Sequence, residues 1–312
     1  MKPTNVLVTG AAGLLGRYVV EALQGRYAVT GLDKRRGPAD IAWHVGDITD
    51  AELVGTAMRG QDMVIHIAAV PNIWSGDGET IMRVNVLGTW QVLNAAEACG
   101  ARRVVLCSSD SVIGFTVAEG RMVPPRYLPV DRDHPLAPTD AYALSKLLAE
   151  ETGRCFAHRG KLEVIALRPV FVAYPDMHGE IMARAADPAG YRGPMAGGPS
   201  AAGGGAVWHH IDPRDAARAF ALGLSMEYRG FESFFLSAAT TLAPEPTLER
   251  LARVLGRLPE VRDPDLYRRQ PFAPLYDLEA ARSRLGFEPQ FDARHLVAVP
   301  EAVTALQPGD GR

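Results

Sequence analysis

The sequence predicts an α/β fold, a doubly wound parallel sheet with a smaller C-terminal lobe, and three observations support this. Apolar runs of strand length alternate with segments of helical periodicity over about the first 170 residues, a pattern typical of a parallel sheet covered by helices. The apolar run Met63–Ala69 has the character of a strand buried on both faces. A glycine-punctuated turn, Thr9–Gly16, joins the first expected strand to the first expected helix.

The first half of the chain carries most of the expected sheet. Each expected helix has apolar residues three or four positions apart, and a short apolar run follows it. Right-handed crossovers between such strands place helices on both faces of the sheet. The expected strands are 6–9, 27–33, 42–45, 63–69, 103–109 and 162–167, and the expected helices are 14–23, 51–58, 80–99 and 140–158.

The composition changes beyond Arg168. Residues 186–205 are rich in glycine, proline and alanine, and this stretch is either a mobile lid or a partly disordered loop. Val207–Ile211 is expected to form a strand, and Asp212 to cap a helix from Pro213 to Leu224. Later segments complete the sheet and a small second lobe: a strand at 234–236, helices at 247–255 and 278–285, and a frayed tail after 307.

This pattern divides the chain into two parts. We assign residues 1–168 to a dinucleotide-binding Rossmann domain, to which strand and helix segments near 207–240 return. Residues 169–312 are assigned mainly to a substrate-binding lobe.

The composition argues against several classes of partner. The formal net charge of −3 does not supply the basic face that nucleic acids and anionic membranes normally require. No run of about eighteen apolar residues predicts a transmembrane helix, and the first strand begins too early to leave room for a signal peptide. The cysteines lack pairing or ligand spacing and are expected to be reduced, buried thiols of a cytoplasmic protein: Cys99, Cys107 and Cys155.

The glycine turn has the features of a dinucleotide site. Glycines at Gly10, Gly13 and Gly16 permit a tight turn and let the backbone approach a pyrophosphate, which the helix N-terminus attracts. Asp33 ends the second expected strand about twenty residues later, where a ribose-binding carboxylate is expected. Taken alone, the turn also fits an ordinary strand-to-helix connection.

A second signal lies on the helix expected at 140–158. Tyr142 and Lys146 are four residues apart and share one helix face. A neighbouring cation favours the phenolate and lowers the pKa of a tyrosine, so the pair can exchange a proton with a substrate hydroxyl or carbonyl. Ser108 and Ser109 end an expected strand, at the edge where open α/β sheets bind ligands. An incidental pair on an amphipathic helix and a serine turn are the alternatives.

Three further groups of residues are open to more than one interpretation. The histidines at 209 and 210, with the acids at 212 and 215, suggest a metal, but adjacent strand residues point to opposite faces and metal is disfavoured. The residues at 72, 74 and 75 either contact substrate or form a surface loop. Arg168 is either structural or binds an anionic group.

Taken in order, these motifs resemble the short-chain dehydrogenase/reductase family, and within it the extended group of NAD-dependent epimerases, dehydratases and sugar dehydrogenases. The resemblance covers most of the chain and includes a C-terminal stretch, Ala281–Pro289, similar to that of sugar-nucleotide enzymes. It rests on TGxxGxxG from Thr9, Gly46-Asp47-Ile48, His66–Ala69, Asn85–Thr89, Ser108-Ser109 with Val112 and Gly114, Tyr142-x-x-x-Lys146 and Leu167-Arg168-Pro169.

The resemblance implies a role for each matching residue. The catalytic residues would be Ser109, Tyr142 and Lys146, and Tyr142 and Lys146 would also contact the cofactor. A carboxylate at Asp33 favours NAD, although Arg35 and Arg36 leave NADP open. The other cofactor-binding residues implied are Gly10, Gly13, Leu14, Leu15 and Gly16 for the pyrophosphate, Asp33 for the ribose, Asp47 and Ile48 for the adenine, and Ala68 and Ala69 along the cofactor.

The resemblance also bears on the substrate. Related 4,6-dehydratases carry an acid at the position of Asp110 but a glutamate where this chain has Ser111, and Ser108–Phe115 looks closer to uronate dehydrogenases. Pro169–Val172 replaces an asparagine that contacts nucleotide diphosphates. We therefore expect an NAD-dependent oxidoreductase acting on a sugar or sugar-like alcohol. The alternatives are a nucleotide-sugar epimerase or dehydratase that recycles NAD internally, and a non-catalytic NAD-sensing protein. Family members are often homodimers through the helices that include Tyr142.

Overall fold

The computed structural model describes residues 4–115, 123–187 and 207–297. Within these residues a parallel seven-stranded sheet has the order β3-β2-β1-β4-β5-β7-β8, and a separate pair joins β6 to β9. The order reverses direction at β1, as expected of a doubly wound sheet. The strands are β1 Asn5–Thr9, β2 Ala28–Asp33, β3 Ala42–Val45, β4 Met63–His66, β5 Arg103–Cys107, β6 Tyr127–Leu128, β7 Glu163–Pro169, β8 Phe231–Leu236 and β9 Glu260–Val261.

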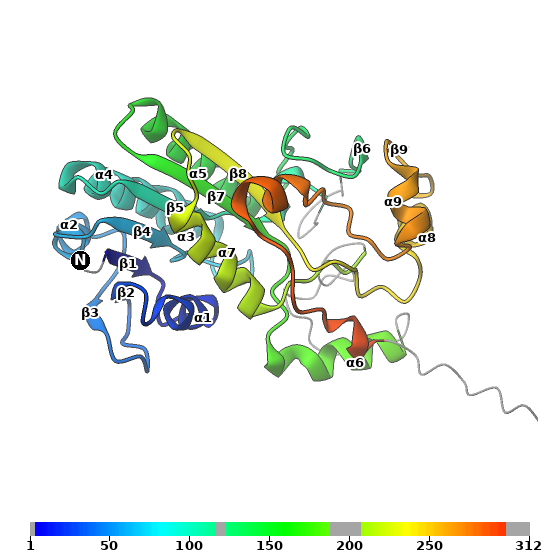
Figure 1. The fold of residues 1–312 in the computed structure, drawn as a ribbon, viewed down its shortest axis with the longest axis horizontal. Helices are drawn as coiled ribbons and strands as arrows, with labels where there is room; N and C mark the ends of the chain where they lie inside the picture. The colour runs from blue at the N-terminus through cyan, green and yellow to red at the C-terminus, as the bar shows by residue number, and fades with distance from the viewer. Residues whose placement is uncertain (1–3, 116–122, 188–206, 298–312) are drawn as a thin grey trace, which may run out of the picture.

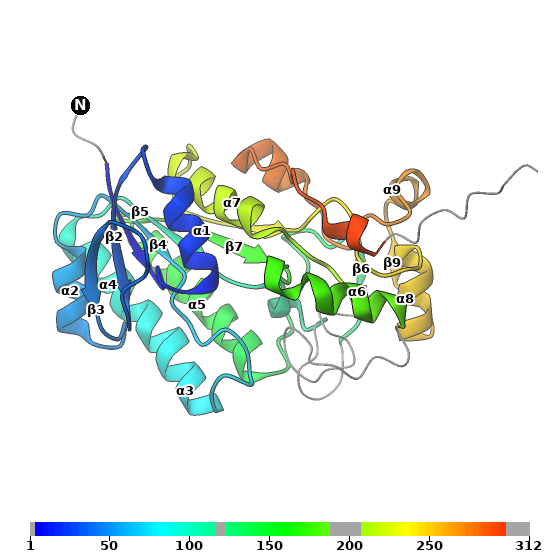
Figure 2. The ribbon, with the colours of Figure 1, turned by 90° about the horizontal axis from the view of Figure 1, so that it is seen from below.

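Helices cover both faces of the large sheet. Helices α1 (Leu14–Leu23) and α7 (Pro213–Ser225) pack together on one face. Figure 2 shows them above the sheet and the other group below it. That group consists of α2 Ala51–Met58, α3 Gly78–Met82, α4 Gly88–Cys99 and α5 Ala141–His158. Apolar side chains of the central strands are buried between the two layers, as the apolar runs predict.

The remaining elements form a lobe beyond the carboxyl ends of the strands, on the right in Figure 1. Its helices are α6 (His178–Ala186), α8 (Thr247–Leu255) and α9 (Pro264–Arg269), and the β6–β9 pair lies with them. Helix α7 and strand β8 return to the sheet from this half of the chain. The site between the sheet and the lobe is therefore assembled from both halves of the sequence.

Several expectations differ from the structure. The helix expected at 80–99 is interrupted by a π-helical turn at Arg83–Leu87. Val207–Ile211 is not a strand: its residues form isolated bridges from His209 and Ile211, since no neighbouring strand runs alongside. The expected strands at 63–69 and 103–109 end at His66 and Cys107. Most of the 186–205 stretch and the tail after 307 lie outside the described residues.

The cysteines were expected to be buried, and two of them are not. Cys99 and Cys155 lie exposed on helix surfaces, whereas Cys107 is partly buried at the end of β5, and all three are free thiols. No helix in the described part of the chain is long and apolar enough to cross a membrane.

Candidate active site

The glycine turn between β1 and α1 leaves no room for side chains. Gly10 has φ +72°, and a Cβ there would lie 2.7 Å from the backbone nitrogen of Ala68. A Cβ on Gly16 would lie 2.0 Å from the Gly10 carbonyl oxygen. These positions require glycine because the turn, the following helix and the segment after β4 are in direct backbone contact. The result is a cradle of main chain at the carboxyl edge of the sheet.

Helix α1 directs its N-terminus into this cradle. Its N-cap is Gly13, so no side chain satisfies the backbone N–H groups of the first turn, which begins at Leu14 and Leu15. Such a helix end attracts phosphate groups. At the end of β2, one Asp33 carboxylate oxygen accepts a hydrogen bond from the Ala12 N–H at 3.0 Å. The turn and the ribose-binding candidate are thus joined, and the donor set fits a dinucleotide.

The adenine-side candidates follow the edge strand β3. Burial opposes ionisation of Asp47, but hydrogen bonds from Thr49 and Lys34 outweigh it and lower the pKa of the carboxyl group. Lys34 Nζ lies 2.9 Å from the Asp47 carboxylate. Ile48 is buried and lies against Gly88 at the start of α4, where a Cβ would come within 2.6 Å of its side chain. Asp47 is therefore held in place, and Ile48 forms an apolar wall beside it.

The cofactor-lining segment after β4 is held by Asn85, which the π-helical turn carries. The Asn85 amide accepts from the Val70 N–H at 2.7 Å and donates to the Val70 carbonyl at 3.0 Å. It also donates to the Ser145 hydroxyl on α5 at 2.9 Å. Asn85 therefore links the segment containing Ala68 and Ala69 to the helix that carries the proton-transfer candidates. Helical periodicity gives no sign of this role.

His66 lies beneath the same segment as a neutral imidazole. Burial, together with the charge of Lys146, lowers the pKa of His66 to about 3. Its Nδ1 is 2.7 Å from the Thr9 hydroxyl, and its Nε2 is 3.0 Å from the Thr89 hydroxyl. Because Thr89 donates its own proton to the Asn85 carbonyl, the hydrogen-bond network places the imidazole proton on Nε2. His66 thus connects β1, β4 and α4.

The three candidate catalytic side chains meet at the end of β5. The Tyr142 phenol lies near the Ser109 hydroxyl, which favours the ionised form of the phenol and lowers its pKa. Lys146 lies one turn further along α5, with Nζ 5.6 Å from the centre of the Tyr142 ring and donating to the Cys107 carbonyl at 2.8 Å. Helix α5 begins where the Asp140 side chain accepts from the Ala143 N–H at 2.7 Å. The structure therefore brings Ser109, Tyr142 and Lys146 together at the end of β5.

The pKa of Tyr142 differs from expectation. The proximity of Lys146 predicts a lowered value, but burial raises the pKa, and the charges of Cys107, Asp110 and Asp140 raise it further, against a lowering by the Ser109 hydrogen bond. Burial also lowers the pKa of Lys146, against a raising by Cys107 and Glu150. With its pKa raised in this way, the Tyr142 phenol is protonated at neutral pH.

Beneath the three residues lies a buried ion pair that sequence reasoning did not find. Glu150, on α5, accepts from Arg168 at 2.8 and 2.7 Å and from the Ser108 hydroxyl at 2.5 Å. Both members are essentially inaccessible to solvent. Arg168 is therefore structural in the described protein, and its two bonded nitrogens hold Glu150. Tyr142, Lys146 and Glu150 are four residues apart along one helix, and this spacing was the sequence feature that could have indicated a role for Glu150.

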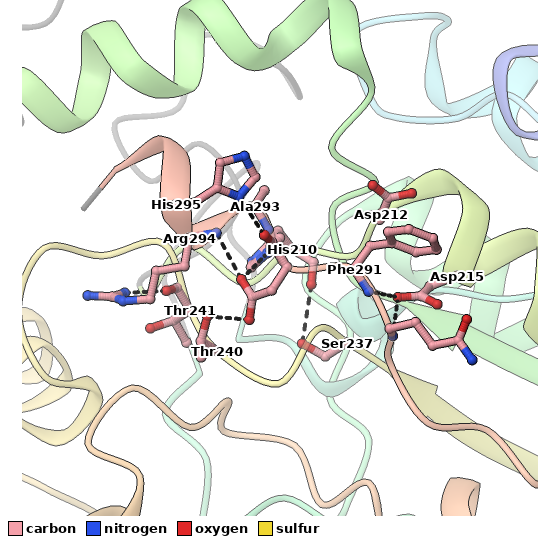
Figure 3. Close-up of polar contacts among 12 residues, drawn as sticks. His210, Asp212, Asp215, Ser237, Thr240, Thr241, Phe291, Ala293, Arg294 and His295 are labelled. Atoms are coloured by element: carbon pink, nitrogen blue, oxygen red, sulfur yellow. Dashed lines mark hydrogen bonds and ion pairs between the residues drawn. The ribbon is translucent and has the colours of Figure 1, made fainter.

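The paired histidines have separate structural partners, and Figure 3 shows one of them. His209 Nε2 accepts from the Leu275 N–H at 3.0 Å. His210 Nε2 accepts from the Ala293 N–H at 3.0 Å, within a group of contacts that ties residues 290–294 to the lobe (Figure 3). Among the described residues, no group of three or more His, Cys, Asp or Glu side chains is placed to hold a metal ion.

The loop after the cofactor-lining segment is stabilised internally. The Asn72 side chain accepts from the Trp74 N–H at 3.0 Å and from the Ser75 hydroxyl at 2.8 Å. Trp74 remains 41% exposed. The interpretation as a surface loop accounts for these contacts.

Comparison with known proteins gives the family. The family model described as the NAD dependent epimerase/dehydratase family matches residues 6–231. The chain belongs to this family. Members of the NAD-dependent epimerase/dehydratase family are enzymes whose cofactor is NAD. The match spans the glycine turn, the three candidate catalytic residues and most of the sheet.

Two named relatives each match about half of this chain. An L-arabinose 1-dehydrogenase (NAD(P)(+)) from Haloferax volcanii is 34% identical over 53% of this chain and 65% of its own length. A uronate dehydrogenase from Pseudomonas putida is 30% identical over 53% of this chain and 59% of its own. The chain thus matches less than two thirds of either relative. A short-chain dehydrogenase/reductase superfamily protein from Agrobacterium tumefaciens, solved with bound NAD, is 27% identical with a TM-score of 0.69, covering 94% of both chains.

Proposed function

We propose that this protein oxidises a hydroxyl group of a sugar or sugar-like alcohol with NAD. The contact between Ser109 and Tyr142, with Lys146 one helical turn away, carries the proposal. These groups lie at the same sheet edge as the main-chain cradle that fits a dinucleotide. Relatives named as arabinose and uronate dehydrogenases support a carbohydrate alcohol as the substrate class.

In this proposal residues 1–168, with returning segments near 207–240, bind the cofactor, and 169–312 mainly bind substrate. When bound, NAD would supply the hydride acceptor. Lys146 would contact the ribose of NAD, and Asp33 would make NAD preferred over NADP by repelling a 2′-phosphate. The remaining contacts are assigned to Gly10, Gly13, Leu14, Leu15 and Gly16 at the pyrophosphate, Asp47 and Ile48 at the adenine, and Ala68 and Ala69 along the cofactor.

Three residues of the chain handle the proton. Ser109 hydrogen-bonds the substrate oxygen and orients it beside Tyr142. Tyr142 would remove the hydroxyl proton as general base, and the ammonium group of Lys146 would help to offset the raised pKa of the phenol. The ion pair of Glu150 with Arg168 holds the neighbouring Ser108 in place.

Replacement of Tyr142 by phenylalanine tests the mechanism. We expect Tyr142→Phe to lower kcat/KM by roughly 10²–10⁴-fold, because the proton acceptor is lost. NAD binding, measured by calorimetry, should persist. The assay follows NADH release on a panel that includes L-arabinose, hexuronic acids and nucleotide sugars. Unchanged turnover in the variant would exclude Tyr142 as the base.

The same panel separates the alternatives. A nucleotide-sugar epimerase or dehydratase, which the family name makes the second candidate, would convert substrate without net NADH release. A non-catalytic NAD-sensing protein would bind NAD in calorimetry and consume no member of the panel.

We also propose that the protein acts as a homodimer in the cytoplasm. Helices α4 and α5 pack together, and large apolar side chains stay exposed on and beside them: Leu87, Trp90, Leu144 and Leu148. A second copy would cover them. Leu144→Glu with Leu148→Glu should convert a dimer to a monomer in light scattering, whereas Val254→Glu, an equally exposed site on α8, should not. The free thiols agree with a reducing compartment.

A further inference from the structure

Tyr276 reaches from the C-terminal lobe to the turn that carries Ser109. Its hydroxyl donates to Asp110 Oδ2 at 2.9 Å, across 166 positions of sequence. Asp110 directly follows Ser109, and both side chains are buried. The side chain of Asp110 therefore lies between the phenol of Tyr276 and the candidate catalytic hydroxyl of Ser109.

The position of Tyr276 is fixed from both sides. The Val130 N–H donates to the Leu275 carbonyl at 2.6 Å, and the Asp277 N–H donates to the Val130 carbonyl at 2.8 Å. The ring stacks on Phe235 of β8, with centroids 4.6 Å apart and planes at 17°. Because backbone and ring are both held, the hydroxyl has a defined place at Asp110.

Ser109 and Asp110 share a tight turn. Ser109 is the N-cap of a short 3-10 helix, Asp110–Ile113, and its oxygen accepts from the Ser111 N–H at 3.1 Å. Its hydroxyl lies 3.3 Å from Asp110 Oδ1, a long and weak contact. The Tyr276 donor occupies the other carboxylate oxygen. Tyr276 therefore helps to orient the carboxylate, and the serine hydroxyl stays near Tyr142.

We propose that Tyr276 is a positioning residue that holds Asp110 so that the Ser109 hydroxyl is available to the substrate oxygen. This inference rests on the proposed function. Without the tyrosine hydroxyl, the carboxylate would be a stronger acceptor and would draw the Ser109 proton toward itself, away from the substrate. The lobe thus takes part in catalysis through one hydrogen bond as well as through substrate contacts.

The same bond affects the charge felt by Tyr142. Within the described residues, the charged and titratable groups facing Tyr142 include Cys107 and Asp110 at the end of β5, and Asp140 and Lys146 on or beside α5. The charge of Asp110 is one of those that raise the pKa of Tyr142. Tyr276, which is itself near Arg168, partly offsets that charge by donating to the carboxylate.

Tyr276→Phe removes the hydroxyl and keeps the stacked ring. We expect kcat to fall on the order of tenfold, while KM for NAD changes less than about twofold because the cradle is untouched. The alkaline rise of the pH–rate profile should move to higher pH, since Tyr142 then faces a fuller negative charge. The matched control is Tyr267→Phe, which removes a buried hydroxyl bonded to the Pro274 carbonyl in the same lobe. It should leave kcat and the profile unchanged.

Asp110→Asn is a second variant that tests the inference, and it can be measured even if Tyr276→Phe does not fold. Loss of the charge should shift the pH–rate profile to lower pH. In the Asp110→Asn background, adding Tyr276→Phe should cost much less than in the wild type, because the carboxylate is gone. The inference would be overturned if Tyr276→Phe kept the wild-type kcat and pH–rate profile, or if it changed kcat no more than Tyr267→Phe does. An unshifted pH–rate profile in Asp110→Asn would also overturn it. Turnover retained in Tyr142→Phe would instead overturn the proposed function.

Discussion

Individual residues in the glycine turn set hard limits on substitution. Gly16→Ala would place a Cβ 2.0 Å from the Gly10 carbonyl oxygen, so the turn must shift. We expect a loss of about 1–3 kcal/mol in the free energy of unfolding and weaker NAD binding. Urea unfolding and calorimetry measure the two effects. Gly55→Ala in α2, where a Cβ meets nothing within 4 Å, should stabilise by about 0.5–1 kcal/mol. If Gly16→Ala and Gly55→Ala had equal effects on stability, the close backbone packing of the glycine turn would be contradicted.

Asp33 tests cofactor choice at the same scale. Asp33→Ser removes the charge that repels a 2′-phosphate but leaves a side chain near the Ala12 N–H. The ratio of kcat/KM for NAD to that for NADP should fall at least about tenfold. Asp40→Ser makes the same change in net charge at an exposed position and serves as control. A ratio that falls equally in both variants would attribute selectivity to net charge.

Elements differ in how far the sequence predicts them. Alternating strands and helices are visible because each buries a periodic apolar face, and helix α7 with its Asp212 cap is as expected. The strand expected at Val207–Ile211 is wrong because strand formation depends on a neighbouring strand, which local sequence does not reveal. For the same reason the Asp110–Tyr276 contact was not found. The candidate site residues follow from motifs that are local in the sequence, whereas Asn85, Glu150 and Tyr276 make contacts across distant segments.

The segment 290–297 shows how one element is held by a buried acid. Asp215 Oδ2 accepts from the Gln290 and Phe291 N–H groups, each at 2.8 Å (Figure 3). Arg218 binds its other oxygen at 2.8 Å. Asp215→Asn replaces one carboxylate oxygen with an NH₂ group, which cannot accept from Arg218 or from the two backbone N–H groups, and it removes the charge. We therefore expect a loss of about 1–3 kcal/mol in the free energy of unfolding. Backbone amides of 290–297 should exchange hydrogen faster in mass spectrometry.

The control for that variant is Asp212→Asn. Asp212 caps α7 by accepting from the Arg214 N–H, and asparagine is an equally good N-cap. Its stability and the exchange of 290–297 should match the wild type within about 0.5 kcal/mol. Unchanged exchange in Asp215→Asn would show that the segment is held by other contacts.

At the scale of the whole molecule, two buried neutral histidines couple folding to pH. Burial first, and neighbouring charge second, lower the pKa of both His66 and His209 to about 3, below about 6.5 in the unfolded chain. The stability they provide is complete above pH 6.5 and is lost as pH falls toward 3. When the pH falls from 7 to 5, each histidine should lower the free energy of unfolding by roughly 2 kcal/mol. Denaturant unfolding at several pH values measures this.

The double variant His66→Gln with His209→Gln should flatten that pH dependence, although its stability at pH 7 will be lower. Asp292 does not interfere above pH 5: burial opposes its ionisation, but the neighbouring His210 and a hydrogen bond from the Thr240 hydroxyl lower its pKa to about 2. Its contribution is lost between about pH 4 and 2. An equally steep slope in the double variant would show that other groups govern acid sensitivity.

The pairing of β8 with β7 has a consequence for the order of assembly. Between 8 and 55 residues separate neighbouring strands from β1 to β7, and 61 separate β7 from β8. Asp110 and Tyr276 are 166 positions apart, and the entropic cost of closing a loop rises with its length. Tyr276 comes later still. We expect a folding chain to form its dinucleotide cradle first and to acquire the Tyr276–Asp110 bond last. Cofactor affinity should therefore recover before turnover when the unfolded protein is diluted from denaturant.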